Sequence, residues 1–355
     1  MRGFAGGAVS INLVIKMTKK FDVAVLGATG VVGEVMLEIL AERQFPVNKV
    51  YALASENSVG KMVKFGNKVL DVLDAAQFDF SQVQIGLFSA GAEVSKKYAP
   101  IAAAAGCVVI DNTSCFRNDP DVPLIIPEVN PKQIADFKKR NIIANPNCST
   151  IQMLVALKPI YDAVGINKIT VATYQSVSGT GKAAIDELIK QSTQLLNGRP
   201  AEPEVYPQQI AFNVLPHIDV FMDNGYTKEE MKMIWETQKI LEDPDLVINP
   251  TTVRVPVFYG HSEAITLETE KPITTEDARK ILSTAPGVQV MDDLKNGIYP
   301  TPFVNAVNQD DVFVGRLRNG IEDQRTLSMW VVADNIRKGA ALNSVQIAEL
   351  LITLL

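Results

Sequence analysis

The segment from Asn145 to Thr150 combines residue types, local geometry and a chemical task. Residues 142–144 have the pattern of a short buried strand, and the apolar spacing from Ile151 to Tyr161 predicts a helix. Cys148 is therefore expected where a strand turns into a helix. A helix N-terminus stabilises an anion, so we expect the thiol pKa to lie below its ordinary value of about 8.5. These polar, helix-capping surroundings favour an activated nucleophile over the alternative, a buried cysteine packed as a small apolar residue.

A thiolate beside a nicotinamide has a well-defined use. It adds to a carbonyl or acyl carbon, and the adduct exchanges hydride with the cofactor through a thioester. Of the two histidines, the better acid/base candidate is His261, which follows a predicted strand and a glycine. His217 lies among apolar residues. Arg254 could hold a carboxylate through two parallel hydrogen bonds, although a lone strand arginine is more often solvated. Backbone N–H groups at the Cys148 turn, or the Gln175 side chain, could donate to the reacting oxygen.

A glycine-rich turn follows the first predicted strand. Residues 21–26 are apolar and partly β-branched; glycines 27, 30 and 33 come next, and a helical pattern extends to Arg43. In a dinucleotide-binding βαβ unit, such glycines allow close backbone approach while the pyrophosphate lies on the helix N-terminus. The G-x-x-G-x-x-G spacing differs from G-x-G-x-x-G, so a plain strand-to-helix turn is the alternative. The next strand, 50–54, would place the loop from Ser55 to Ser58 at the adenosine ribose.

The elements that must position these residues fall into two groups. Strands at 83–88 and 107–111, with a helix at 93–105 between them, continue the strand and helix alternation of a Rossmann-type, doubly wound parallel sheet. Its ligands bind at the carboxyl ends of the strands, so nucleotide and Cys148 would share one edge.

After the helix that begins at Cys148 the pattern changes to an α+β domain with a mostly antiparallel sheet. Val253 to Phe258 alternates like a strand, and Thr227 with Glu230 predicts a helix cap. A final helix from 335 to 354 ends in apolar residues that we expect to pack on the nucleotide domain. The other predicted elements are strands 168–177, 263–268, 288–291, 312–317 and 327–333, helices 183–196, 227–241 and 275–285, and an exposed loop at 197–207.

Length and composition set the limits of function. The chain has 355 residues, a net charge of −6 and no basic tract, so nucleic acid and anionic membranes are not expected partners. No apolar run reaches the ~18 residues of a membrane span. The three cysteines cannot all pair and lack metal-ligand spacing, which predicts a reducing, cytoplasmic location without structural disulfides or a metal site. We expect a disordered extension at 1–17, a dinucleotide-binding domain at 18–149 with 334–355, and a second domain at 150–333.

Six segments spread along the chain share the pattern of one known family. They are Gly27 to Gly33, Asp111 to Arg117, Asn145 to Thr150, Tyr174 to Lys182, Arg254 to His261 and Asp334 to Ala341. Through them the sequence resembles the aspartate-semialdehyde dehydrogenases, from Phe21 to Glu349. The resemblance implies NADP-dependent reduction of aspartyl 4-phosphate to aspartate semialdehyde, with release of inorganic phosphate. It also implies a place in lysine, methionine, threonine and diaminopimelate biosynthesis, and assembly as a homodimer or dimer of dimers through the second, substrate-binding domain.

The resemblance also implies roles for individual residues. Cys148 would form the acyl-thioester, His261 would be the acid/base and Gln175 would orient the acyl group. The remaining residues would bind ligands: Arg254 and Glu229 the substrate's carboxylate and amino ends, Arg117 and Lys232 the phosphate, and Gly27, Thr29, Gly30, Val31, Val32, Gly33, Ser55, Asn57, Ser58, Ser178, Gly179 and Asn335 the cofactor.

One departure from the family concerns the cofactor. Many relatives carry an arginine in the loop from Ser55 to Ser58, where this chain has Glu56 and Asn57. A carboxylate there would repel the 2′-phosphate of NADP and could accept from a ribose hydroxyl, so NAD is a possible cofactor as well, although Lys61 could still serve a phosphate. A second departure, Cys115, is expected to pack as a small residue.

Three other functions are the alternatives. The nearest is N-acetyl-γ-glutamyl-phosphate reductase, which shares the nucleophile and the phosphate chemistry; Asn147 and the spacing from Arg254 to His261 favour the first family. A catalytically silent relative acting in assembly is disfavoured by the retention of Cys148, Gln175, Arg254 and His261 together. A thiol hydrolase would leave the glycine-rich unit unexplained.

Overall fold

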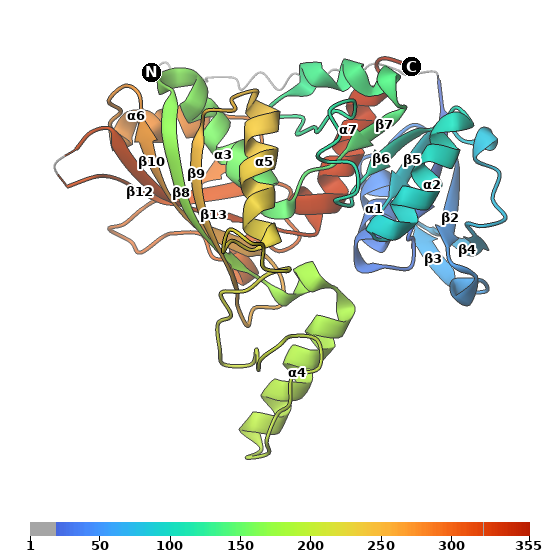
Figure 1. Ribbon diagram of the computed structural model, residues 1–355, viewed down its shortest axis with the longest axis horizontal. Coiled ribbons are helices and arrows are strands. Elements are labelled where there is room, and N and C mark those ends of the chain that lie inside the picture. Colours follow the sequence, from blue (N-terminus) through green and yellow to red (C-terminus); the bar gives the residue numbers. More distant parts are fainter. Residues whose placement is uncertain (1–18, 322) are drawn as a thin grey trace, which may run out of the picture.

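The computed structural model describes residues 19–321 and 323–355 of the protein. The expectation of a disordered extension at 1–17 concerns residues outside these ranges. The described chain forms two β-sheets with their helices, and one long helix projects away from both sheets (Figure 1).

The first sheet has the strand order β3-β4-β2-β1-β5-β6-β7. Its neighbours pair in parallel except β3 with β4, which confirms the predicted doubly wound sheet. The order reverses between β1 and β5, and such a switch point is where ligands bind in open α/β sheets. The elements are β1 (Phe21–Leu26), α1 (Val31–Glu42), β2 (Val47–Ala54), β5 (Ile85–Phe88), α2 (Ala92–Ala104), β6 (Val108–Asp111) and β7 (Ile142–Ala144).

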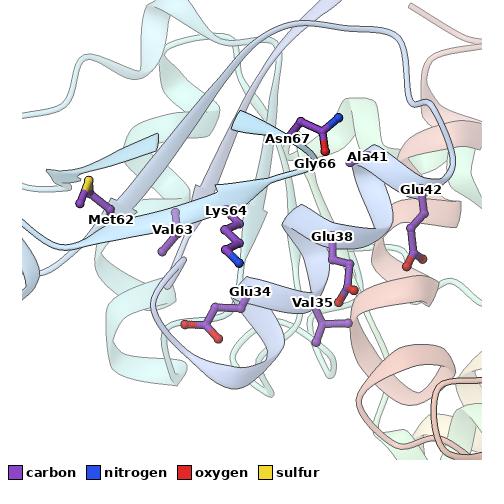
Figure 2. Close-up of a pocket in the computed structure, with 10 residues that line it drawn as sticks. All are labelled: Glu34, Val35, Glu38, Ala41, Glu42, Met62, Val63, Lys64, Gly66 and Asn67. Carbon is purple, nitrogen blue, oxygen red and sulfur yellow. The ribbon is translucent and has the colours of Figure 1, made fainter. Parts of the chain in front are cut away.

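A hairpin at the edge of this sheet was not predicted. Strands β3 (Met62–Phe65) and β4 (Lys68–Asp74) are antiparallel around a turn in which Gly66 has φ 55°. The missed signal was this glycine between two short, half-polar runs. The hairpin and α1 enclose an open groove, shown in Figure 2, that none of the predicted site residues line.

The second sheet has the order β11-β12-β13-β10-β8-β9. Three of its five pairings are antiparallel, whereas β8 with β9 and β11 with β12 are parallel, so the sheet is mixed with an antiparallel majority. Its strands are β8 (Ile166–Gln175), β9 (Val247–Arg254), β10 (His261–Thr269), β11 (Val288–Val290), β12 (Val312–Asn319) and β13 (Thr326–Ala333).

The predicted strand from Val253 to Phe258 is wrong. The strand is β9, which ends at Arg254 and contains Pro250. Proline lacks an N–H, yet β9 lies at the sheet edge, where a missing donor is tolerated. The chain beyond Arg254 is irregular up to Gly260, whose φ of 83° suits a turn before β10.

Three helices cover one face of the second sheet. Helix α3 (Cys148–Val164) packs on β8, β10, β12 and β13, between α5 (Lys228–Leu241) and α6 (Thr275–Ser283). Thr227 and Glu230 form the predicted capping box of α5. The opposite sheet face carries Tyr174 and Trp330, whose ring centroids lie 5.4 Å apart. The projecting helix in Figure 1 is α4 (Lys182–Leu196).

The C-terminal helix starts later than predicted. A π-helical turn at Arg337–Ala341 precedes α7 (Leu342–Leu351). Before this turn the Asp334 carboxylate accepts the backbone N–H groups of Ile336 and Arg337. Helix α7 contacts α1, β5 and β6 and shares a core with them. The remaining short helices are η1 (Glu56–Ser58), η2 (Phe80–Gln82), η3 (Pro131–Lys139), η4 (Val177–Thr180) and η5 (Pro302–Ala306).

Candidate active site

Three predicted site residues from distant parts of the chain lie in one row. Gln175 pairs with Arg254 across β8 and β9, and Ser262 pairs with Tyr174, so His261 lies beside Gln175 on β10. The exposed fractions of Arg254, Gln175 and His261 are 5%, 1% and 0%. The row lies at the ends of β8, β9 and β10. Because residues two apart on a strand share a face, it lies on the sheet face that α3 and α5 cover. Strand register therefore brings these three residues together.

The predicted nucleophile lies at the predicted turn. Strand β7 ends at Ala144 and α3 begins at Cys148. Asn147 caps the helix, because its Oδ1 accepts the Ser149 N–H at 3.0 Å. Gly339 approaches the nucleophile closely, since a Cβ there would come within 2.8 Å of the Cys148 Cβ.

The expectation of a lowered thiol pKa is wrong. Burial raises the pKa of Cys148 to about 12, and the Glu229 carboxylate adds to the increase. The cations Arg254 and Arg117 and the Ser149 N–H act in the opposite direction but do not compensate. A helix N-terminus is present, but the protein atoms around this partly exposed thiol and a neighbouring carboxylate outweigh it.

His261 is held as a neutral ring. Its Nδ1 accepts the Ser176 N–H at 3.1 Å, which assigns the proton of the neutral ring to Nε2. Among the described residues Nε2 has no hydrogen-bond partner, and it borders Gly179. Burial, followed by the Arg254 charge, holds the pKa of His261 well below 6.5. The ring can therefore donate a hydrogen bond to a reacting oxygen at neutral pH.

Glu229 connects the turn at Cys148 to the row of Arg254, Gln175 and His261. Its Oε1 accepts from Asn147 Nδ2 at 2.9 Å and from Gln175 Nε2 at 3.3 Å, and its Oε2 accepts from Lys232 at 3.1 Å. Burial raises the pKa of Glu229, but Lys232, Asn147 and Arg254 outweigh burial and lower it below its ordinary value. Lys232 also donates to Asp219 at 2.7 Å. Glu229 is therefore a buried carboxylate that keeps its charge.

The predicted phosphate and carboxylate ligands keep free donors. Arg117 Nη1 donates to Glu236 at 3.0 Å, and Arg254 Nη1 donates to the Ser176 carbonyl at 2.7 Å. The Nε atoms of both arginines are buried and have no hydrogen-bond partner within residues 19–321 and 323–355. A cavity of about 270 Å³ is lined by Arg117, Cys148, Gln175, Glu229 and Lys232 together with Val32, Asn112, Ser114, Pro146, Asn147, Ser178, Gly179, Asn335, Ile336, Gly339 and Ala340. Arg254 and His261 do not line it, but both border its Gly179.

The predicted cofactor residues divide between cavities. Gly27, Thr29, Gly30, Ser55 and Ser58 line a cavity of about 600 Å³ at the switch point. Val32, Ser178, Gly179 and Asn335 line the Cys148 cavity, and Val31 lines a third one. Gly33 lines none of these; it packs on the turn, where a Cβ would lie 2.1 Å from the Gly27 carbonyl oxygen. Asn57 is exposed in η1.

The glycine turn fits a dinucleotide. A Cβ at Gly27 would lie 2.7 Å from the Ser89 carbonyl oxygen, and its φ is 90°, so this backbone requires glycine. Gly30, the N-cap of α1, makes no side-chain cap. Gly30 thus adds no side chain at the helix start, which suits the binding of a pyrophosphate there.

Several residues at the site were not predicted. Asn112 and Ser114 line the Cys148 cavity, and the motif from Asp111 to Arg117 was their signal. Glu236 lies seven residues after Glu229, and this helical spacing could have indicated it. Lys97 lines the switch-point cavity, whereas Lys61 does not. The row and the Cys148 cavity do not include His217, which stacks on Phe221 at 4.3 Å.

Three further observations concern the described chain. The three cysteines, Cys107, Cys115 and Cys148, are free thiols, as predicted. Within residues 19–321 and 323–355, no group of three or more His, Cys, Asp or Glu side chains is arranged to hold a metal ion. Over the same ranges, no helix has both the length and the apolar character that crossing a bilayer requires.

Comparisons with known proteins agree with this geometry. Residues 22–137 match the family described as semialdehyde dehydrogenase, NAD binding domain, and residues 157–338 match semialdehyde dehydrogenase, dimerisation domain. The aspartate-semialdehyde dehydrogenase of Legionella pneumophila is 64% identical over 94% of this chain and 96% of its own length. That of Aquifex aeolicus is 54% identical over 94% and 98%. A solved structure of aspartate semialdehyde dehydrogenase II from Vibrio cholerae, complexed with ASA, is 60% identical, covers 95% of this chain and 99% of its own, and superposes with a TM-score of 0.93.

Two family matches together span most of the chain, full-length relatives are more than half identical to it, and a solved relative has the same fold. This chain therefore belongs to the aspartate-semialdehyde dehydrogenase family.

Proposed function

We propose that the protein reduces L-aspartyl 4-phosphate to L-aspartate 4-semialdehyde with NADP as cofactor, through a thioester on Cys148. The observation that carries this proposal is the composition of one cavity. It presents a cysteine, a buried carboxylate (Glu229) and two cations (Arg117 and Lys232), and it borders the glycine turn through Val32. An amino acid activated as an acyl phosphate offers the groups that complement this set.

The charges of the cavity suit the two ends of the substrate. Glu229 can pair with the ammonium group, and the row arginine Arg254, with its unpartnered Nε, can bind the α-carboxylate. Arg117 and Lys232 can hold the phosphate, because a dianion is best balanced by two cations. Gln175, held at Glu229 and Thr173, can orient the acyl group.

The substrate itself would help to activate the thiol. Glu229 is the charged neighbour that raises the pKa of Cys148. An ammonium group bound at Glu229 would offset that charge and favour the thiolate, while Arg254 and Arg117 act in the same direction. The thiolate then attacks the acyl carbon, a C–S bond forms and phosphate leaves with the electrons of the C–O bond.

The second half of the reaction uses His261. The bound nicotinamide cofactor supplies the hydride that reduces the thioester. His261, neutral with its proton on Nε2, can donate to the oxygen on which negative charge develops. Breakage of the C–S bond then releases the aldehyde and returns the sulfur of Cys148.

We place the cofactor on the turn from Gly27 to Gly33, with Ser55, Asn57 and Ser58 near the ribose and Ser178, Gly179 and Asn335 near the nicotinamide. We also propose a cytoplasmic homodimer or dimer of dimers, the domain limits predicted from the sequence, and a role in lysine, methionine, threonine and diaminopimelate biosynthesis. The dimerisation family match and the exposed sheet face with Tyr174 support the assembly.

The test measures phosphate-dependent reduction of NADP, followed at the nicotinamide absorbance. Aspartate semialdehyde should support turnover and N-acetylglutamate semialdehyde should not. Cys148→Ala should lower kcat by about 10⁴-fold or more, because a covalent step is lost. Cys115→Ala is the matched control, since this thiol lies outside the cavity. Turnover of the N-acetylated aldehyde alone would support the rival reductase, and retained activity in Cys148→Ala would exclude the thioester.

A further inference from the structure

Glu236 connects the turn at Cys148 to Arg117, which is predicted to bind phosphate. It lies on α5 with 1% of its surface exposed. Its Oε1 accepts from Arg117 Nη1 at 3.0 Å, and its Oε2 accepts the backbone N–H of Asn147 at 2.6 Å. One buried carboxylate thus holds two donors that belong to different loops, one after β6 and one after β7.

Helix α5 fixes the Arg117 loop at a second point. Lys239, one turn after Glu236, donates to the carbonyl oxygens of Arg117 at 2.8 Å, Asp119 at 2.7 Å and Val122 at 2.9 Å. The guanidinium and the main chain of Arg117 are therefore both bound to the same helix. Since Glu229 on α5 also accepts from Asn147 Nδ2 at 2.9 Å, the helix acts as a common frame for Arg117 and Cys148.

We propose that Glu236 is a positioning residue that sets the orientation of Arg117 relative to Cys148, and through it the position of phosphate at the thioester. The inference rests on the proposed role of Arg117 in phosphate binding. The ion pair with Glu236 takes Nη1, and the Asn112 carbonyl takes Nη2 at 3.0 Å. These two contacts fix the guanidinium plane, and within the described chain its Nε has no hydrogen-bond partner.

The step that depends on this orientation is transfer to and from phosphate. In the oxidative direction a phosphate oxygen attacks the acyl carbon, the C–O bond forms and the thiolate of Cys148 leaves. Bond formation of this kind needs the reacting atoms aligned at close range, so an arginine free to rotate would slow it. Formation of the thioester from aldehyde and NADP does not involve phosphate, and the two steps can therefore be measured separately.

The experiment uses Glu236→Gln in the full-length protein. The amide can accept from only one of the two donors, and it removes the charge that pairs with Arg117. We expect KM for phosphate to rise about tenfold or more, because an aligned anion site is lost. The first turnover of NADPH formation without phosphate should change less than about threefold, because Asn147 remains held by Glu229.

The matched control is Glu230→Gln. Glu230 is a buried glutamate on the same helix and likewise accepts from two donors, the backbone N–H groups of Thr227 at 2.8 Å and Thr252 at 2.9 Å, but not from Arg117 or Asn147. It should lower thermal stability and leave KM for phosphate within about twofold of the wild type. An equal rise of KM in both variants would show that only helix stability is involved and would overturn the proposal.

A double-mutant cycle with Arg117→Lys separates the positioning role of Glu236 from the phosphate-binding role of Arg117. If Glu236 acts through Arg117, the double variant should have nearly the KM for phosphate of Arg117→Lys alone. Additive effects would overturn the positioning role. If Arg117→Lys by itself leaves KM unchanged, the proposed phosphate role of Arg117 fails instead. Should Glu236→Gln not fold, Glu236→Asp, which keeps the charge but shortens its reach, decides the same question: an unchanged KM would refute the inference.

Discussion

Two of the strand-to-helix turns at the carboxyl edge of the first sheet have opposite surroundings. The turn from Gly27 to Gly33 leads from β1 into α1, and its N-cap, Gly30, makes no side-chain cap. The turn from Asn145 to Cys148 leads from β7 into α3; its N-cap is Asn147, and α5 contributes two carboxylates to it. The N-cap of the first turn contributes no side chain, whereas the second turn is bonded by side chains of Asn147, Glu229 and Glu236.

These two turns show that the electrostatic effect of a helix N-terminus depends on the groups around it. At the first turn the bare backbone is suited to an anionic ligand. At the second turn the same geometry surrounds a thiol whose pKa is raised to about 12, by burial first and then by Glu229. The groups packed around a helix N-terminus decide whether its positive potential is available to a ligand or to a nucleophile.

Among the changes that test this comparison, the largest expected effect comes from adding one carbon to the first turn. In Gly33→Ala the Cβ would lie 2.1 Å from the Gly27 carbonyl oxygen, so the turn must open. We expect the dissociation constant for NADP to rise about 100-fold, because the backbone that meets the pyrophosphate is displaced. Calorimetric titration measures this change.

Gly30→Ala provides the comparison for that variant. Its φ of −90° is accessible to alanine, and the nearest atom to a Cβ is at 3.3 Å, so its effect should be much smaller. Equal affinities in wild type and Gly33→Ala would show that the turn does not carry the cofactor. Circular dichroism of both variants separates lost binding from lost fold.

The second expected effect concerns the thiol at the second turn. Because the pKa of Cys148 is raised to about 12, its alkylation by iodoacetamide should accelerate about tenfold per pH unit from pH 7 to 9 without a plateau. Glu229→Gln removes a charge that raises this pKa, so it should speed alkylation at pH 8 about fivefold. Both measurements use a Cys115→Ala background, since Cys115 is also partly accessible. A plateau near pH 7 would mean that the helix end dominates after all.

The smallest expected effect is on cofactor choice beside the first turn. Glu56 is exposed, and Ser55 and Ser58 of the same loop line the switch-point cavity. Glu56→Arg should raise the ratio of kcat/KM for NADP over NAD about fivefold, the size expected of an exposed charge pair. The gain should shrink at high salt because exposed charges are screened. A wild-type preference for NADP of about 100-fold, or no response to this substitution, would show that Glu56 does not face the 2′-phosphate.

The sequence by itself determined the features that depend on neighbours a few residues away. Glycine spacing identified the first turn, apolar periodicity located the strand and helix around Cys148, and Thr227 with Glu230 indicated the cap of α5. Each of these rests on backbone geometry or local hydrogen bonds, which a short window of sequence contains.

The tertiary structure decided what depends on groups far apart in the chain. Cross-strand register placed Arg254, Gln175 and His261 in one row, and α5 brought Glu236 to Arg117 and Asn147. Edge position, and not composition, allowed Pro250 within β9. The thiol pKa was wrongly predicted because ionisation depends on water and charges that surround a group in space, and folding brings those groups together from distant segments.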